Sequence, residues 1–200
     1  MQNLTGVKSR IMQNLYQKIQ KIESLQAAAD RATAAFKKRY NVDCLQHCAE
    51  CCKYNDINAS PLEFLPMAWH LYKTGQLEDF FEKISKTDSK QCIFSVFKDD
   101  RWGCTCYPSR GMICRLFGFA CTKNKLGKPA FAACHTLKHS FPDKINTICQ
   151  KVTISKRVPV IADFYQKLSM LDLNLGEELI PINQAIKEAC EIVYMHTAYK

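Results

Sequence analysis

The sequence predicts a mainly α-helical single domain with a small β-hairpin, folded around a polycysteine metal centre. Helix is indicated by apolar residues that recur at three- and four-residue steps near both ends of the chain. The metal centre is indicated by four cysteines within nine residues, in a chain that has twelve. We expect three parts: an N-terminal helical segment at residues 1–40, a cysteine-cluster metal-binding core at 41–140, and C-terminal helices at 141–200 that pack on the core.

Residues 3–40 are expected to form one long helix or two in series, because no proline interrupts them and Gly6 is their only glycine. Packing of the apolar stripe on the core is favoured over a self-associating coiled coil, since Lys18 and Gln26 interrupt the heptad. This helix is also the candidate surface for a protein partner. The stripe consists of Leu4, Val7, Ile11, Leu15, Ile19, Ile22, Leu25, Ala29, Ala32 and Phe36.

A second helix is predicted to begin shortly after the first group of cysteines. Ser60 is a suitable cap, Pro61 suits the first turn, and Glu63 completes a capping box. The helix should end near Gly75, which can adopt the left-handed conformation. A further short helix is expected over about residues 77–84, where apolar residues again recur at helical spacing.

The β-hairpin is predicted in the middle of the chain, where two apolar and aromatic runs at residues 91–97 and 102–107 flank a polar turn at 98–101. Pairing of the two strands would bring Cys92 towards Cys104 or Cys106. A turn at residues 108–110 then leads into a short helix that carries Cys114 and ends at Gly118.

The last third of the chain is expected to begin with an exposed loop and continue as helices. Polar residues, Gly127 and Pro129 indicate the loop over residues 122–130. Apolar faces at helical spacing then predict helices over about 142–152, 159–171 and 177–197.

Composition and charge exclude several classes of protein. The first residues lack the apolar core of a signal peptide, and no run of 18 apolar residues suggests a membrane span. A cytoplasmic location is therefore expected, where thiols stay reduced and cysteines favour metal over disulfides. The net charge of +9 suggests an anionic partner, but eight thiolates holding two divalent ions would lower it to +5. Because the basic residues are dispersed, nucleic-acid binding is disfavoured.

The cluster Cys44, Cys48, Cys51 and Cys52 predicts half of a metal site. If the segment is helical, the four thiols stand at i, i+4, i+7 and i+8, on one face. Neighbouring thiolates repel one another unless a cation lies between them. Cys51 and Cys52 are adjacent and are expected either to diverge to two sites or to share a polynuclear one. Eight thiolates suffice for two four-coordinate sites.

The order of the cysteines resembles the bacterial YkgJ-type cysteine-cluster family, which is described as a zinc- or iron-chelating domain. A related segment occurs in flagellin lysine-N-methylases. The resemblance covers roughly residues 44–135. It rests on Cys-x3-Cys-x2-Cys-Cys, on Cys92, on the string Cys104-x2-Tyr107-x2-Arg110-x3-Cys114-Arg115-x-Phe117-Gly118, and on Cys134.

The resemblance implies eight metal ligands and leaves one choice open. Gly111 stands where the family string has proline, and Cys106 replaces an isoleucine, so Cys104 and Cys106 compete for one role; Cys104 is favoured. The remaining thiols, Cys106, Cys121, Cys149 and Cys190, are interpreted as core or surface residues. The implied ligands are Cys44, Cys48, Cys51, Cys52, Cys92, Cys104, Cys114 and Cys134.

Four other residues near the cysteines carry alternative interpretations. His47 and His135 are expected to lie beside the metal rather than to bind it. Arg110 and Arg115 either donate N–H bonds to sulfur or form ordinary ion pairs with acidic side chains, and the sequence does not favour one of these over the other.

Three classes of function agree with these features. The first is a metal-binding protein that chelates zinc or iron, as single ions or as an iron–sulfur cluster. The second is an iron–sulfur protein that supports electron or methyl transfer, as the methylase relation suggests. The third is an interaction module that metal only stabilises. A catalytic cysteine is disfavoured, because nothing distinguishes one thiol from the other eleven.

A radical S-adenosylmethionine enzyme is a further alternative, because Cys44-x3-Cys48-x2-Cys51 has the spacing of its cluster loop. It is disfavoured for two reasons. Glu50 replaces the usual aromatic residue, and Cys52 follows the third cysteine directly. The chain also lacks the alternation of strands and helices that a barrel requires.

Overall fold

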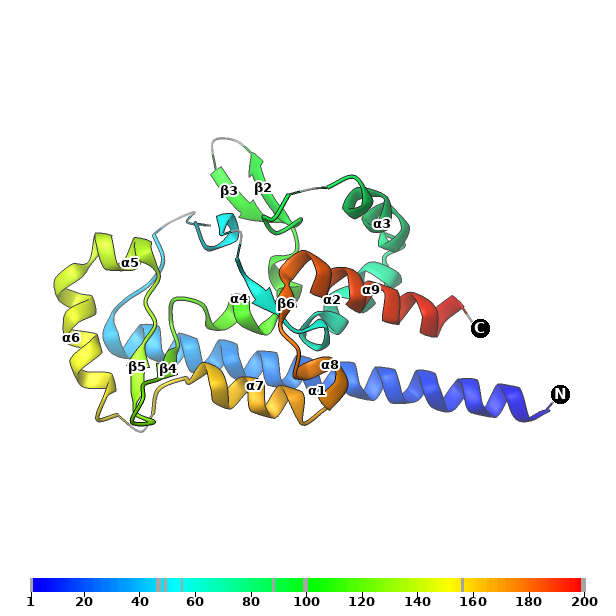
Figure 1. The fold of residues 1–200 in the computed structure, drawn as a ribbon, viewed down its shortest axis with the longest axis horizontal. Helices are drawn as coiled ribbons and strands as arrows, with labels where there is room; N and C mark the ends of the chain where they lie inside the picture. Colours follow the sequence, from blue (N-terminus) through cyan, green and yellow to red (C-terminus); the bar gives the residue numbers. More distant parts are fainter. Residues whose placement is uncertain are drawn as a thin grey trace.

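The computed structural model describes residues 2–45, 48, 50–54, 56–87, 89–98, 101–155 and 157–198, with the side chains of 2–13, 98, 101 and 102 not described. The fold is mainly α-helical with small two-stranded antiparallel sheets, as expected. A long N-terminal helix runs along one side, and the other elements pack on it (Figure 1). No helix in the described part of the chain is long and apolar enough to span a bilayer.

The N-terminal segment is one continuous helix, α1 (Gln2–Tyr40), which packs on the core as predicted. Its buried positions alternate steps of four and three residues. Gln26, which interrupts the heptad of a coiled coil, is buried within this stripe and donates to the Glu63 carbonyl oxygen at 2.8 Å. The side chains of the first turns are not described, so a partner surface there stays a prediction. The buried residues are Leu15, Ile19, Ile22, Gln26, Ala29, Thr33 and Phe36.

A second layer of helices covers the middle of α1. The helix predicted after Ser60 forms as a 3-10 turn, η2 (Pro61–Phe64), followed by α2 (Leu65–Lys73), and Gly75 reverses the chain with φ of +70°. The predicted short helix is α3 (Leu77–Ser85). The last helix, α9 (Ile182–Ala198), packs on α2 and η2.

The start predicted for the last helix, at residue 177, was wrong by five residues. Residues 180–181 form strand β6 (Ile180–Pro181), which pairs with β1 (Asn58–Ala59) and so leaves the helical path. The short helix α8 (Leu173–Gly176) before it was also missed. Pairing between segments more than a hundred residues apart is not visible in local periodicity.

The predicted hairpin is confirmed, with shorter strands than the apolar runs suggested. Strand β2 (Ser95–Lys98) pairs with β3 (Arg101–Cys104), and Ser95 lies opposite Cys104. The turn residues 99 and 100 lie outside the described part of the chain.

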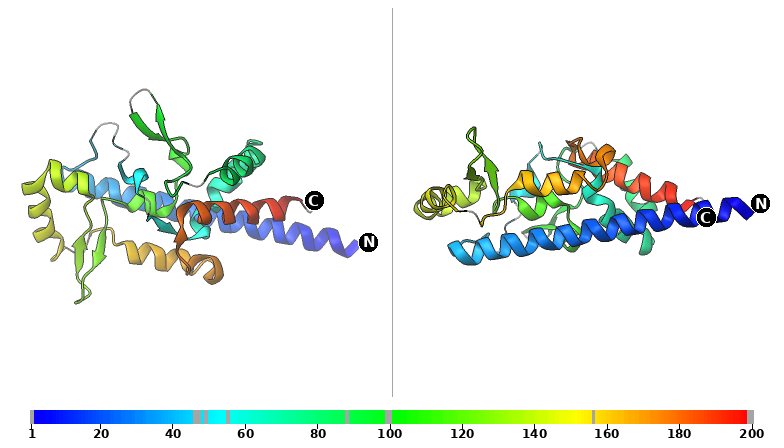
Figure 2. Two further views of the ribbon diagram at one scale, coloured as in Figure 1. Left: turned by 45° about the horizontal axis from the view of Figure 1, so that its top comes forward. Right: turned by 90° about the horizontal axis from the view of Figure 1, so that it is seen from below.

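The segment 122–130, expected to be a loop, contributes to a second hairpin. Strand β4 (Cys121–Lys123) pairs with β5 (Pro129–Phe131). The turn is closed by the Asn124 side chain, which accepts from the backbone of Leu126 and Lys128 at 2.9 Å each. This hairpin projects from the body of the molecule (Figure 2).

Four further helices lie between residues 112 and 169, and α4 and α7 among them pack on α1. Helices α6 and α7 match the predicted segments, and α5 was not predicted. A second buried cluster joins the end of α1 to α5 and α6 through Phe36, Val42, Leu137 and Ile148. These helices are α4 (Met112–Leu116), α5 (His135–Ser140), α6 (Pro142–Val152) and α7 (Ile161–Ser169).

Glu63 is a fully buried carboxylate that joins several elements. Oε1 accepts from the Ser60 backbone at 3.0 Å and from the Tyr165 hydroxyl at 2.8 Å, and Oε2 accepts from the Ile113 backbone at 2.7 Å. Burial raises the pKa of Glu63 to about 7, and these donors oppose that rise. Together with the bond from Gln26, the residue connects α1, η2, α4 and α7.

We expect Glu63→Gln to lower the free energy of unfolding by about 1–3 kcal/mol, because one amide N–H would face a buried donor. Chemical denaturation monitored by circular dichroism would measure the loss. Glu78→Gln, at an exposed position of α3, is the control and should change little. Equal stability of the two variants would show that the Glu63 carboxylate does not join these elements.

Candidate metal centre

Seven of the eight predicted ligands line one cavity of about 400 Å³. They come from separate segments of the chain. Two lie between α1 and η1 (Glu50–Lys53), two lie on the 3-10 turn η1 itself, one precedes β2, one ends β3, and one lies on α4. These segments meet above the C-terminal half of α1, whose Thr33 and Lys37 also line the cavity (Figure 1). All twelve cysteines of the chain are free thiols. The seven are Cys44, Cys48, Cys51, Cys52, Cys92, Cys104 and Cys114.

The helix considered for residues 44–52 does not form in the described residues. Helix α1 ends at Tyr40, and Asn41 adopts a left-handed conformation with φ of +50°. The Asp43 side chain then accepts from the Cys44 backbone at 2.8 Å, which competes with helical hydrogen bonding. The thiols of this cluster therefore converge through an irregular segment and η1 rather than through one helical face. Residue His47 lies outside the described part of the chain.

The adjacent cysteines of the cluster hold their sulfurs together. The Sγ atoms of Cys51 and Cys52 are 4.0 Å apart. Four sulfurs at about 2.3 Å from a zinc ion are separated by about 3.8 Å along each edge of the tetrahedron. The two side chains thus point in a common direction, and their separation is close to that of two ligands of one ion.

The eighth predicted ligand, Cys134, lies beside the cavity rather than in its lining. It caps α5, where its sulfur accepts from the Leu137 backbone at 3.5 Å. It is near enough to Cys44 that negative charge on Cys134 raises the pKa of Cys44. Cys48 and Cys51 act on Cys44 in the same way, so these thiols form one neighbourhood.

A second neighbourhood surrounds Cys114 on α4. Burial raises its pKa well above the ordinary value, and charge on Glu63, and then on Cys92, Cys51 and Cys104, raises it further. The hairpin brings Cys92 near Cys104, as its register predicted. Cys51 is common to both neighbourhoods, which places the pair Cys51–Cys52 between them.

Burial favours the protonated form of several of these thiols. It raises the pKa of Cys44 and of Cys92 to about 11 each. The hydrogen bond with Cys52, then burial, raise the pKa of Cys51. Two cations act in the opposite direction: Lys37 on Cys44, and Arg110 on Cys51 and Cys104. A bound cation would favour the ionised form of Cys44, Cys51 and Cys92.

The structure separates Cys104 from its competitor Cys106. Cys104 lines the cavity, whereas Cys106 is buried outside the lining and lies near Cys190 of α9. Cys190 and Cys121 are fully buried, and Cys149 is exposed on α6. His135 is exposed at the start of α5, where its ring stacks on that of His139.

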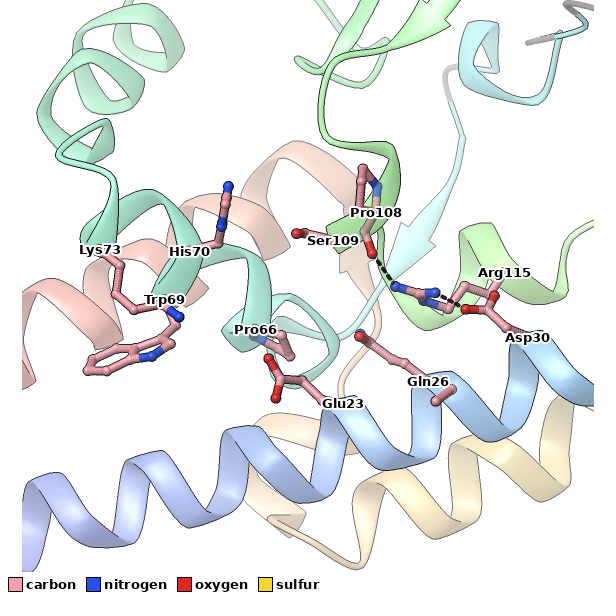
Figure 3. A pocket seen from close by; sticks show the side chains of 11 residues that line it. Glu23, Gln26, Asp30, Pro66, Trp69, His70, Lys73, Pro108, Ser109 and Arg115 are labelled. Atoms are coloured by element: carbon pink, nitrogen blue, oxygen red, sulfur yellow. Dashed lines mark hydrogen bonds and ion pairs between the residues drawn. The ribbon is translucent and has the colours of Figure 1, made fainter.

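The two arginines beside Cys114 have different environments. Arg115 is buried; it forms an ion pair with Asp30 and donates to the carbonyl oxygens of Pro108 at 2.7 Å and Arg110 at 3.0 Å. Figure 3 shows this arrangement at the wall of a second cavity of about 250 Å³ between α1 and α2. Arg110 makes a longer contact with Asp30, at 3.3 Å, and lies over the Tyr107 ring.

Gly111 is explained by close packing next to these arginines. A Cβ atom at this position would lie 2.6 Å from the Phe64 ring and 2.7 Å from the Glu63 carboxylate. The proline that the resemblance led us to expect here would therefore require the neighbouring side chains to shift. With glycine at position 111, the Phe64 ring and the Glu63 carboxylate can pack directly against the Gly111 backbone.

The part of the chain that carries these cysteines matches a known protein family. A family model named CxxCxxCC, described as "Putative zinc- or iron-chelating domain", matches residues 43–150. The chain belongs to this family. No curated protein and no solved structure matches it.

The CxxCxxCC match begins one residue before Cys44 and includes all eight predicted ligands. Helix α1 and helices α7 to α9 lie outside it. Metal chelation by the cysteine cluster is thus what this family membership indicates. The two-stranded sheets in the described residues do not form the barrel of a radical S-adenosylmethionine enzyme.

The thiols are gathered but not yet in the positions of metal ligands. Among the described residues, no group of three or more His, Cys, Asp or Glu side chains is placed to hold a metal ion. The donor set nevertheless suits zinc or iron, because both bind four thiolates in tetrahedral geometry.

We expect Asp30→Asn to lower the free energy of unfolding by about 1–3 kcal/mol, because Arg115 would remain buried without its anion. Asp163→Asn is the matched control, since Asp163 pairs with Lys123 at an exposed position and should cost less than about 1 kcal/mol. Denaturant titration of both variants measures the difference. A loss no greater than that of the control would contradict a structural role for the Asp30 pair.

Proposed function

We propose that this protein chelates zinc or iron through two four-sulfur centres built from the eight cysteines. The observation that carries the proposal is the convergence of seven free thiols, from separate segments of the chain, on one cavity. These thiols do not form disulfides. A cysteine that serves only as a small buried apolar residue has no need of other thiols beside it. The sites require a reducing compartment, which the cytoplasm provides.

The two neighbourhoods supply three ligands each. Cys44, Cys48 and Cys134 form one group, and Cys92, Cys104 and Cys114 form the other. The pair Cys51 and Cys52 would provide the fourth ligand of each centre, which requires the two sulfurs, 4.0 Å apart without metal, to turn towards different groups when the ions bind. This division supports two tetrahedral sites, in which each thiol loses a proton when the metal binds.

Metal binding must also draw the thiols closer together than they stand in the structure. Cys44 and Cys48 lie outside helices and strands, and Cys51 and Cys52 lie on the short 3-10 turn η1. The hairpin base and α4 are held by strand pairing and by the Glu63 network. Binding would therefore bring these four thiols towards those of the hairpin and α4, and part of the binding energy would appear as folding energy.

Protein purified anaerobically without chelators is expected to hold about two metal ions per chain, measured by elemental analysis. Stripping the metal with a chelator should lower the unfolding temperature and release protons on reloading, because the buried thiols are protonated without metal. Fully reduced protein that binds neither zinc nor iron would refute the proposal.

Single cysteine variants test the division into two centres. Cys134→Ser and Cys114→Ser should each lose about half of the bound metal, and the double variant should lose all of it. Cys190→Ser is the control, because its thiol is buried away from the cavity, and it should keep the full amount. Equal metal content in all of these variants would reject the assignment of ligands.

An iron–sulfur cluster is the second candidate, favoured by the size of the cavity. About 400 Å³ exceeds the space that two bare ions need, and Cys51 belongs to both neighbourhoods. A cluster would support electron or methyl transfer. The same elemental analysis separates the candidates, because a cluster brings inorganic sulfide and a brown colour that zinc does not.

A further inference from the structure

Arg110 has one hydrogen-bond donor that the protein leaves unused. Within the described part of the chain, its Nε atom is buried and has no hydrogen-bond partner. An unpaired buried donor is unfavourable, and more so when the group is charged. Because Arg110 lines the cysteine cavity, the groups of that cavity are the candidates for the missing partner.

The rest of the Arg110 side chain is fixed in place. One terminal nitrogen lies 3.3 Å from Asp30, and the guanidinium carbon lies 4.0 Å from the centre of the Tyr107 ring. Its backbone carbonyl accepts from Arg115. The free Nε–H therefore belongs to a guanidinium whose orientation is set by contacts on its other sides.

Cysteine sulfurs are the most numerous side-chain acceptors that the cavity offers to this donor. Its described lining has no aspartate or glutamate, and it has two hydroxyls, those of Thr33 and Tyr107, against seven cysteine sulfurs. The sulfurs are also the groups that become anionic when metal binds. Arg110 lowers the pKa of Cys51 and of Cys104, so it lies close to both thiols. Thiolates accept stronger hydrogen bonds than thiols do.

We propose that Arg110 is a positioning residue whose Nε–H donates to a thiolate of Cys51 or Cys104 in the metal-loaded protein. This inference rests on the proposed function. Four thiolates on a divalent ion carry an excess of two negative charges, which the guanidinium offsets. Lys37 has a different setting, because it pairs with Asp43 and lies over the Phe119 ring near Cys44.

The neighbouring Arg115 provides the contrast. Its hydrogen bonds with described residues run to Asp30 and to backbone carbonyl oxygens, although Arg115 lines the cysteine cavity too. Arg115 therefore fastens the loop before α4 to α1. The two arginines differ in that Arg110 alone of them has a buried donor without a partner in the described part of the chain.

The test compares Arg110→Lys with Arg115→Lys in the full chain. Arg110→Lys keeps the charge but loses the Nε–H donor, and it should release zinc to a chelator roughly 10- to 100-fold faster than the wild type. Its metal-free form should unfold at the wild-type denaturant concentration. Arg115→Lys should instead destabilise the metal-free and metal-loaded forms alike.

Two results would overturn the inference. Zinc release from Arg110→Lys at the wild-type rate would show that charge alone suffices. Equal destabilisation of its metal-free and metal-loaded forms would assign Arg110 the same structural task as Arg115. Failure of the wild-type protein to bind metal is a different result, because it refutes the proposed function itself before either variant is compared.

Discussion

The burial of one carboxylate, that of Glu63, is the constraint on which the arrangement of the middle of the molecule depends. A carboxylate can be buried only if donors surround it, and here the donors come from η2, α4 and α7. The backbone of the same residue is bonded by Gln26 of α1. Because each donor must be in place, the position of α4 is set by groups far away in the sequence.

The placement of α4 in turn sets one side of the cysteine cavity. Cys114 lies one residue after Ile113, whose backbone N–H is bound by Glu63. Arg115 follows, and its ion pair with Asp30 ties the same short helix to α1. The hairpin then brings Cys92 and Cys104 to this side. This side of the cavity is thus positioned by hydrogen bonds, an ion pair and strand pairing.

The other side of the cavity is built differently. Four of its thiols lie between the end of α1 and strand β1, two of them on the 3-10 turn η1. Cys134 approaches from the cap of α5, which belongs to the second buried cluster. This side of the cavity is therefore attached to a different part of the hydrophobic core than the side formed by α4.

Local pattern in the sequence was sufficient wherever a structure depends on near neighbours. The apolar stripe predicted α1, the Ser60–Glu63 spacing predicted the start of η2, and the alternating aromatic runs predicted the hairpin β2–β3. The cysteine spacing and the string around Arg110 indicated the family and its candidate ligands. In each case the interactions lie within a few residues along the chain, so the residue types themselves carry the information.

Only the tertiary structure decided what depends on distant partners. In the sequence, Gln26 indicates only an interruption of a heptad, because its acceptor, the Glu63 carbonyl oxygen, lies on another element. The β1–β6 pairing, which delays the start of α9, joins segments that share no local signal. The roles of Arg110 and Arg115 stayed open in the sequence, since either could reach an anion or a sulfur. Folding places Asp30 beside Arg115 and leaves the Nε–H of Arg110 at the thiol cavity, and no spacing rule specifies that choice.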